Sequence, residues 1–139
     1  MVILSVSISA SPAILWQTLV NADQIFKWWD GGIVLEHHLG GRFEEPWTND
    51  AGQRIVTTGK VLAFDPQERL CLSWKDPDWP AETEVEITLR EVPEGTELTL
   101  VHKGWERLTG LDHKKLLKDH ESGWNYLIRE LARVAESGA

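Results

Sequence analysis

The chain has 139 residues, which fits one domain over 1–139 that buries roughly two thirds of its unfolded surface. Its formal net charge of −8 disfavours nucleic-acid binding, and its single cysteine excludes an internal disulfide. No apolar run reaches the roughly 20 residues that a membrane-spanning helix needs, and no basic signal segment opens the chain. We therefore expect a cytoplasmic protein without a membrane span.

The first part of the chain predicts a strand, two short helices and a second strand. Apolar residues alternate with serines over 2–9, as in a half-buried strand. Ser11 and Pro12 favour the start of a helix, and a second short helix is expected over about 22–29. The next strand, about 33–45, contains paired glycines that indicate a bulge or bend. Because of Gly40 and Gly41, the pattern leaves open which residues of this strand face inward.

The second part predicts a run of neighbouring strands and then a long helix. Strands are expected over about 54–64, 69–75, 83–92 and around the stretch "LTLVHKGW" at 98–105, which together are typical of an antiparallel meander. A helix should run from Asp112 to about Glu136, because apolar residues recur there every three or four positions. Such a stripe must be buried against the sheet. The order predicts an α+β fold, with a curved antiparallel sheet wrapped around a long C-terminal helix.

Four motifs strengthen this expectation: "SISASPAILWQTLVNADQIFKWW", "LGGRFEE", "LTLVHKGW" and "HESGWNYLIRELARV". In this order they resemble the SRPBCC, or START-like, superfamily, in its branch named for the activator of the heat-shock-protein-90 ATPase (Aha-type). The resemblance implies the helix-grip fold: seven strands grip the C-terminal helix, and the cavity between them holds an apolar or amphipathic ligand in many relatives. The pattern alone gives six strands, so the resemblance implies a split strand, with 33–45 divided at its glycines. It implies no catalytic motif.

Three connections should lie together at one end of the meander, namely 46–54, 76–82 and 104–111. They are the longer connections, and each carries one tryptophan: Trp47, Trp79 and Trp105. Exposed aromatic side chains there would suit a protein partner.

Two histidines should point into the fold near this end. His102 shares the parity of Leu98 and Leu100 along its strand, and His120 lies on the apolar stripe of the long helix. A lone histidine on an apolar face is usually a hydrogen-bonded core residue, but two that converge on an expected cavity favour a pocket. The candidate ligand-binding residues are His102, His120, Trp74, Trp124, Leu100, Leu116 and Phe43, and for the two tryptophans core and pocket are weighed evenly.

No metal site or cofactor is expected. His37 and His38 are adjacent in a strand and point to opposite faces, and the chain has neither an HExxH motif nor a cysteine pair. The leading hypothesis is a protein that binds a small hydrophobic or amphipathic molecule, such as a lipid. The alternatives are a cyclase- or hydrolase-type enzyme that uses His102 or His120 as general acid or base, and a co-chaperone-like interaction module that uses the tryptophans of the connections.

Overall fold

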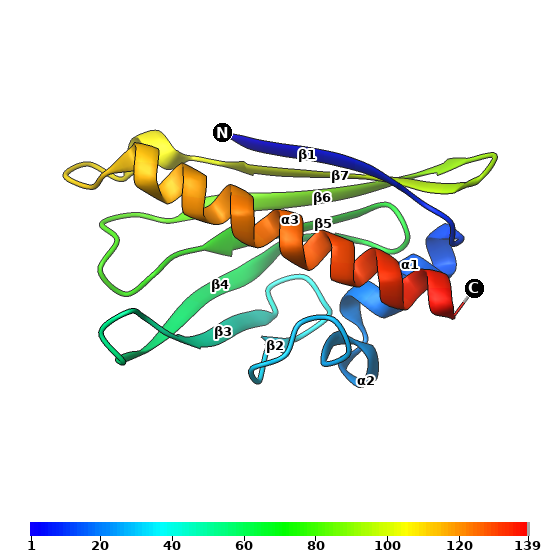
Figure 1. Cartoon of the computed structure of the whole chain (residues 1–139), viewed down its shortest axis with the longest axis horizontal. Helices are drawn as coiled ribbons and strands as arrows, with labels where there is room; N and C mark the ends of the chain where they lie inside the picture. Colours follow the sequence, from blue (N-terminus) through cyan, green and yellow to red (C-terminus); the bar gives the residue numbers. More distant parts are fainter. Residues whose placement is uncertain (139) are drawn as a thin grey trace.

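The computed structural model describes residues 1–138 and shows a long helix lying across one face of a seven-stranded antiparallel sheet (Figure 1). The order across the sheet is β1-β7-β6-β5-β4-β3-β2, so each strand from β2 to β6 pairs with the next along the chain, and β7 also pairs with β1. The predicted α+β helix-grip fold is confirmed. The strands are β1 (Val2–Ile8), β2 (Val34–Leu35), β3 (Arg42–Thr48), β4 (Arg54–Asp65), β5 (Arg69–Trp74), β6 (Thr83–Val92) and β7 (Gly95–Lys103).

The two longest helices begin where the sequence provides a side-chain cap. The Ser11 side chain accepts a hydrogen bond from the Ile14 N–H, and Pro12 occupies the first helical position of α1. Asp112 likewise caps α3, accepting from the Lys115 N–H at 3.1 Å. The second short helix is shorter than expected, since the chain continues in turns after α2. The helices are α1 (Pro12–Val20), α2 (Ala22–Ile25), the 3-10 helix η1 (Trp105–Arg107) and α3 (His113–Ser137).

The expected split of the strand over 33–45 occurs at its glycines, which separate β2 from β3. A Cβ atom on Gly41 would overlap the carbonyl oxygen of Glu36, so the bend requires glycine there. The strand then continues to Thr48, further than predicted. Its phase is now defined: Phe43 is fully buried beneath α3, whereas the Arg42 side chain is 60% exposed on the opposite face.

The long connections all lie at the end of the sheet where α3 begins, as predicted (Figure 1). They join β3 to β4, β5 to β6 and β7 to α3, while the tight turns lie at the opposite end. The helices α1 and α2 cover the end where α3 finishes. No helix among residues 1–138 has both the length and the apolar character to cross a membrane.

Candidate ligand-binding cleft

The interior beneath the first half of α3 is filled by aromatic rings. Trp74, the last residue of β5, lies at the centre, with its ring centroid 5.3 Å from Phe43, 5.6 Å from His102, 5.1 Å from Trp124 and 6.1 Å from His120. We call the whole group the aromatic cluster: Trp29, Phe43, Trp74, Trp79, His102, Trp105, His120 and Trp124.

Both ring nitrogens of His102 are engaged inside this cluster. Trp124 donates its indole N–H to Nδ1 at 3.1 Å, and an indole can only donate, so the proton of the neutral ring lies on Nε2. Nε2 then donates to the Thr83 hydroxyl at 2.7 Å, and that hydroxyl donates to the carbonyl of Trp74. Burial, with a smaller effect of His120, lowers the pKa of His102 to about 2. His102 is thus held neutral, with 0% of its surface exposed.

His120 is fixed in a similar way but at the edge of the cluster. Its Nδ1–H donates to the carbonyl of Leu116 one turn earlier, and its Nε2 accepts the indole N–H of Trp74 at 3.3 Å. Burial lowers its pKa. The rings of His102 and His120 lie 5.3 Å apart, so the two histidines do converge as predicted from the pattern. Neither ring keeps a free nitrogen lone pair for proton abstraction.

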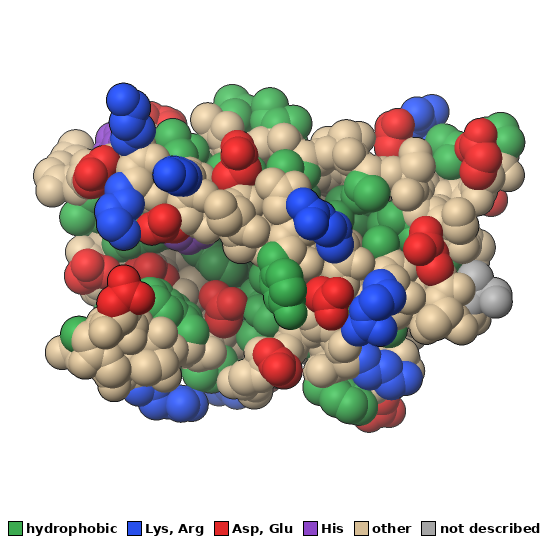
Figure 2. All heavy atoms as spheres, viewed as in Figure 1, with side chains coloured by type: hydrophobic (Ala, Val, Ile, Leu, Met, Phe, Trp, Pro, Cys, Tyr) green, Lys and Arg blue, Asp and Glu red, His purple; other side chains and the backbone are tan. Residues whose placement is uncertain are grey.

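Open space is found beside the cluster, between α3 and the strands β3 to β5. An inner hollow of about 140 Å³ adjoins an outer hollow of about 490 Å³, and we call the two together the cleft. Figure 2 shows this recess beside α3, with apolar side chains on its floor and acidic ones around it. Both hollows are lined by Glu45, Trp74, Asp119 and His120.

Two partly buried carboxylates give the cleft its electrostatic character. Glu45 accepts the indole N–H of Trp29 at 2.9 Å. Its burial, opposed by that hydrogen bond and assisted by the charge of Asp76, raises the pKa of the Glu45 carboxyl to about 7. Burial also raises the pKa of Asp76, which accepts a hydrogen bond from Thr57. Thr57 in turn accepts the indole N–H of Trp47.

This fold and its gripped helix have known relatives. Residues 9–136 match the family described as activator of Hsp90 ATPase homolog 1-like protein. The chain belongs to this family. The resemblance drawn from the four motifs is thereby confirmed.

Several solved structures superpose over nearly the whole chain. Protein MLL2253 from Mesorhizobium loti is 25% identical with a TM-score of 0.80, and the match covers 99% of this chain and 98% of that one. Protein CV1439 from Chromobacterium violaceum is 22% identical at 0.80, covering 97% and 96%. The Aha1 dimer from Colwellia psychrerythraea is 22% identical at 0.75, covering 97% and 95%. Among curated proteins, none matches the sequence significantly.

The resemblance implies a large cavity between α3 and the sheet, but the described residues enclose only a small hollow there. The hollow enclosed beneath α3 has only about 20 Å³, far less than the roughly 300 Å³ or more of a typical ligand pocket. The tryptophan rings fill the interior, and the larger hollows lie beside α3. The expected cavity is therefore corrected to a cleft that opens between α3 and β3.

The candidate residues divide accordingly. The cleft is lined by Trp74, Trp124, Leu116 and His120. The other three, His102, Leu100 and Phe43, are each 0% exposed. The rings of Phe43 and His102 pack against Trp74 from the interior. His102 was expected to line the opening of the cavity, but it lies in the core with both ring nitrogens hydrogen-bonded.

The expectation of three exposed tryptophans at the connections is wrong for two of them. Trp79 and Trp105 are each 4% exposed, and their rings close the end of the core around His120. Trp105 also donates its indole N–H to the carbonyl of His102. Trp47 lies within β3, is 37% exposed and lines the outer hollow.

Sequence reasoning missed Glu45 and Trp29, which lie on the cleft wall and directly behind it. The signal was present in the alternation of Phe43, Glu45 and Trp47, which places an acid between two aromatic residues on one face of β3. The phase of this strand was undetermined, so the acid could not be assigned inward.

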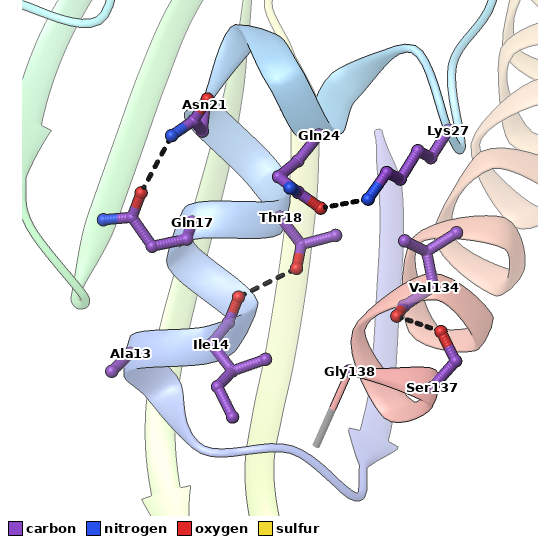
Figure 3. A pocket seen from close by; sticks show the side chains of 10 residues that line it. All are labelled: Ala13, Ile14, Gln17, Thr18, Asn21, Gln24, Lys27, Val134, Ser137 and Gly138. Atoms are coloured by element: carbon purple, nitrogen blue, oxygen red, sulfur yellow. Dashed lines mark hydrogen bonds between the residues drawn. The ribbon is translucent and has the colours of Figure 1, made fainter.

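A second hollow, of about 680 Å³, lies at the other end of α3, against α1 and α2 (Figure 3). Its polar side chains bond to one another or to nearby backbone: Asn21 donates to Gln17, Lys27 donates to Gln24, and the Thr18 hydroxyl donates to a backbone carbonyl. Because these groups are already satisfied locally, this hollow offers weaker recognition than the cleft.

Proposed function

We propose that this protein binds a small amphipathic molecule, such as a lipid or an aromatic natural product, in the cleft between α3 and β3. The observation that carries the proposal is the pairing of an apolar inner hollow with a polar outer one. The inner hollow is walled mainly by tryptophan and leucine, and it shares Glu45, Asp119 and His120 with the outer hollow. The outer hollow adds further carboxylates and hydroxyls. Ligand sites commonly combine an apolar surface with a few placed polar groups.

The aromatic cluster supports this role by holding the cleft wall rigid. Trp74 stacks on Phe43 at an interplanar angle of 25°, and its indole N–H is bound to His120. A wall whose rings are fixed before binding loses little entropy when a ligand arrives.

The two alternative functions receive less support. Acid–base catalysis by His102 or His120 would need a ring nitrogen that is free to take a proton, and all four are hydrogen-bonded. The hypothesis of an interaction module required three exposed tryptophans, but Trp79 and Trp105 are buried and cannot contact a partner.

A thermal-shift screen of lipids, sterols, flavonoids and aromatic polyketides tests the proposal. Binders should raise the melting temperature, and a ligand at 100 times its Kd should stabilise by about 2.7 kcal/mol. The decisive variant is Gly123→Leu. Gly123 lines the inner hollow, and a Cβ atom there meets nothing within 4 Å, so the leucine should fill the space without a clash.

The matched control is Ser122→Leu, which adds the same side chain at the neighbouring, exposed helix position. Gly123→Leu should abolish the ligand-induced shift while Ser122→Leu preserves it. A screen without hits, or hits that bind Gly123→Leu as well as the wild type, would refute binding in the cleft.

A further inference from the structure

We propose that the polar end of the ligand is an organic cation, an alkyl- or arylammonium group, held beside Glu45 against the tryptophan walls. This inference rests on the proposed function and specifies the chemistry of its ligand. It begins from the charges that line the outer hollow. Four carboxylates, on Glu45, Asp50, Asp76 and Asp119, stand there against a single ammonium group on Lys115.

The single ammonium group does not neutralise the inner part of the cleft. Lys115 is already paired with Asp119 at 3.0 Å, one helical turn away and near the solvent. Among residues 1–138, no lysine or arginine forms an ion pair with Glu45 or Asp76. The field inside the cleft is therefore negative and attracts cations.

Acidic side chains are common on a chain of this net charge, and Glu45 differs from them by its geometry. Its Oε2 atom is fixed by the indole N–H of Trp29, while no group among the described residues donates to Oε1. Every fully buried side-chain polar atom of the described residues has a partner, so Oε1 is not fully buried. Since Glu45 lines both hollows, we infer that this oxygen is accessible from the cleft. A positioned carboxylate oxygen thus faces the hollow without a counter-ion.

The walls around this oxygen favour an organic cation over a metal ion. Trp74 lines both hollows, Trp124 the inner one and Trp47 the outer one. Aromatic faces attract ammonium groups, most strongly where water is displaced. Residues 1–138 contain no group of three or more histidine, cysteine or acidic side chains arranged to hold a metal ion.

The ionisation of Glu45 agrees with this picture. Burial makes its charged form costly, as the raised pKa of about 7 indicates. A cation beside Oε1 would offset that cost, so binding and ionisation should favour each other.

The test uses three probes that share a naphthalene ring: (1-naphthylmethyl)trimethylammonium, 1-naphthylmethanol and 1-naphthylacetate. Their affinities are measured by isothermal titration calorimetry at pH 8, where Glu45 is mostly ionised. We expect the cation to bind about tenfold tighter than the alcohol, and the anion to bind more weakly than either.

Glu45→Gln should reduce the affinity for the cation about tenfold, to that of the alcohol, and leave the alcohol unchanged. The glutamine amide oxygen still accepts from Trp29, so the variant removes charge and little else. The control is Glu44→Gln, the next residue of β3, whose side chain faces away from the cleft and pairs with Arg42. It should change neither affinity.

The outcomes separate the two claims. If the alcohol binds as tightly as the cation, or if Glu44→Gln weakens cation binding as much as Glu45→Gln, the cation-specific site is refuted while the cleft still binds ligands. If none of the probes binds while the thermal-shift screen yields a ligand that Gly123→Leu excludes, this inference fails and the proposed function stands. If the screen yields no such ligand either, both fail.

Discussion

The ionisation of Glu45 links the stability of the fold to the chemistry of the cleft. Because its folded pKa of about 7 exceeds its ordinary value of 4.5, the folded state holds the proton more tightly than the unfolded chain. This contribution to stability is fully present below pH 4.5 and is lost as the pH rises through about 7. The charge of Asp76 acts in the same direction.

Glu45→Gln should therefore be more stable than the wild type at pH 8, by about 1–3 kcal/mol, and the difference should vanish near pH 4.5. Urea unfolding at several pH values measures it. The lowered pKa values of His102 and His120 weaken the fold as the pH falls below 6.5, but they are present in both proteins and cancel in the difference. Equal stability of the two proteins at pH 8 would show that Glu45 is not desolvated.

The alternation of residues along β7 and the apolar stripe of α3 predicted the direction of the two histidines, but not their hydrogen bonds. It placed His102 inward on β7 and His120 inward on α3, and their rings lie 5.3 Å apart. Parity could not reveal that Trp124 and Thr83 would occupy both nitrogens of His102, because those partners come from two other elements. Hydrogen-bond saturation depends on three-dimensional packing that a pattern in one strand does not contain.

Among the elements, α3 was the easiest to predict, whereas for β4 only the span could be predicted. The cap at Asp112 and the apolar stripe gave α3 almost to the residue. For β4, the pattern gave the span but not its irregularity. The pairing with β5 shifts between Val61 and Ala63, and Gly59 lies so close to β5 that a Cβ atom would overlap the carbonyl oxygen of Ser73.

Alanine substitutions should distinguish a glycine that close packing requires, Gly59, from one with open space around it, Gly123. Gly59→Ala should destabilise the protein by about 3 kcal/mol or more, because backbone must move to admit the methyl group. Gly123→Ala should stabilise it by about 1 kcal/mol, since alanine favours a helix interior and its Cβ meets nothing within 4 Å. Thermal unfolding distinguishes them, and similar effects from both changes would contradict the close approach of β4 and β5.

For the whole molecule, the order of elements sufficed to predict an antiparallel meander under a long helix, and the family resemblance supplied the seventh strand. Neither source could predict how completely the interior would be filled. That depends on the summed volume of rings such as Trp29, Trp74 and Trp124 against the curvature of the sheet. Because these rings fill the space beneath α3, the larger hollows lie beside the helix. The proposed binding site is therefore also beside α3.

The indole N–H signals of ¹⁵N-labelled tryptophan, followed by NMR during a titration with 1-naphthylmethanol, locate binding directly. The neutral probe keeps this test independent of the ligand's charge. The signals of Trp47, Trp74 and Trp124 should shift, because their rings line the cleft. Those of Trp16 and Trp28 should stay in place, since Trp28 donates to Thr18 at the far end of α3. Shifts confined to Trp16 and Trp28, or no shifts at millimolar probe, would contradict a binding cleft between α3 and β3.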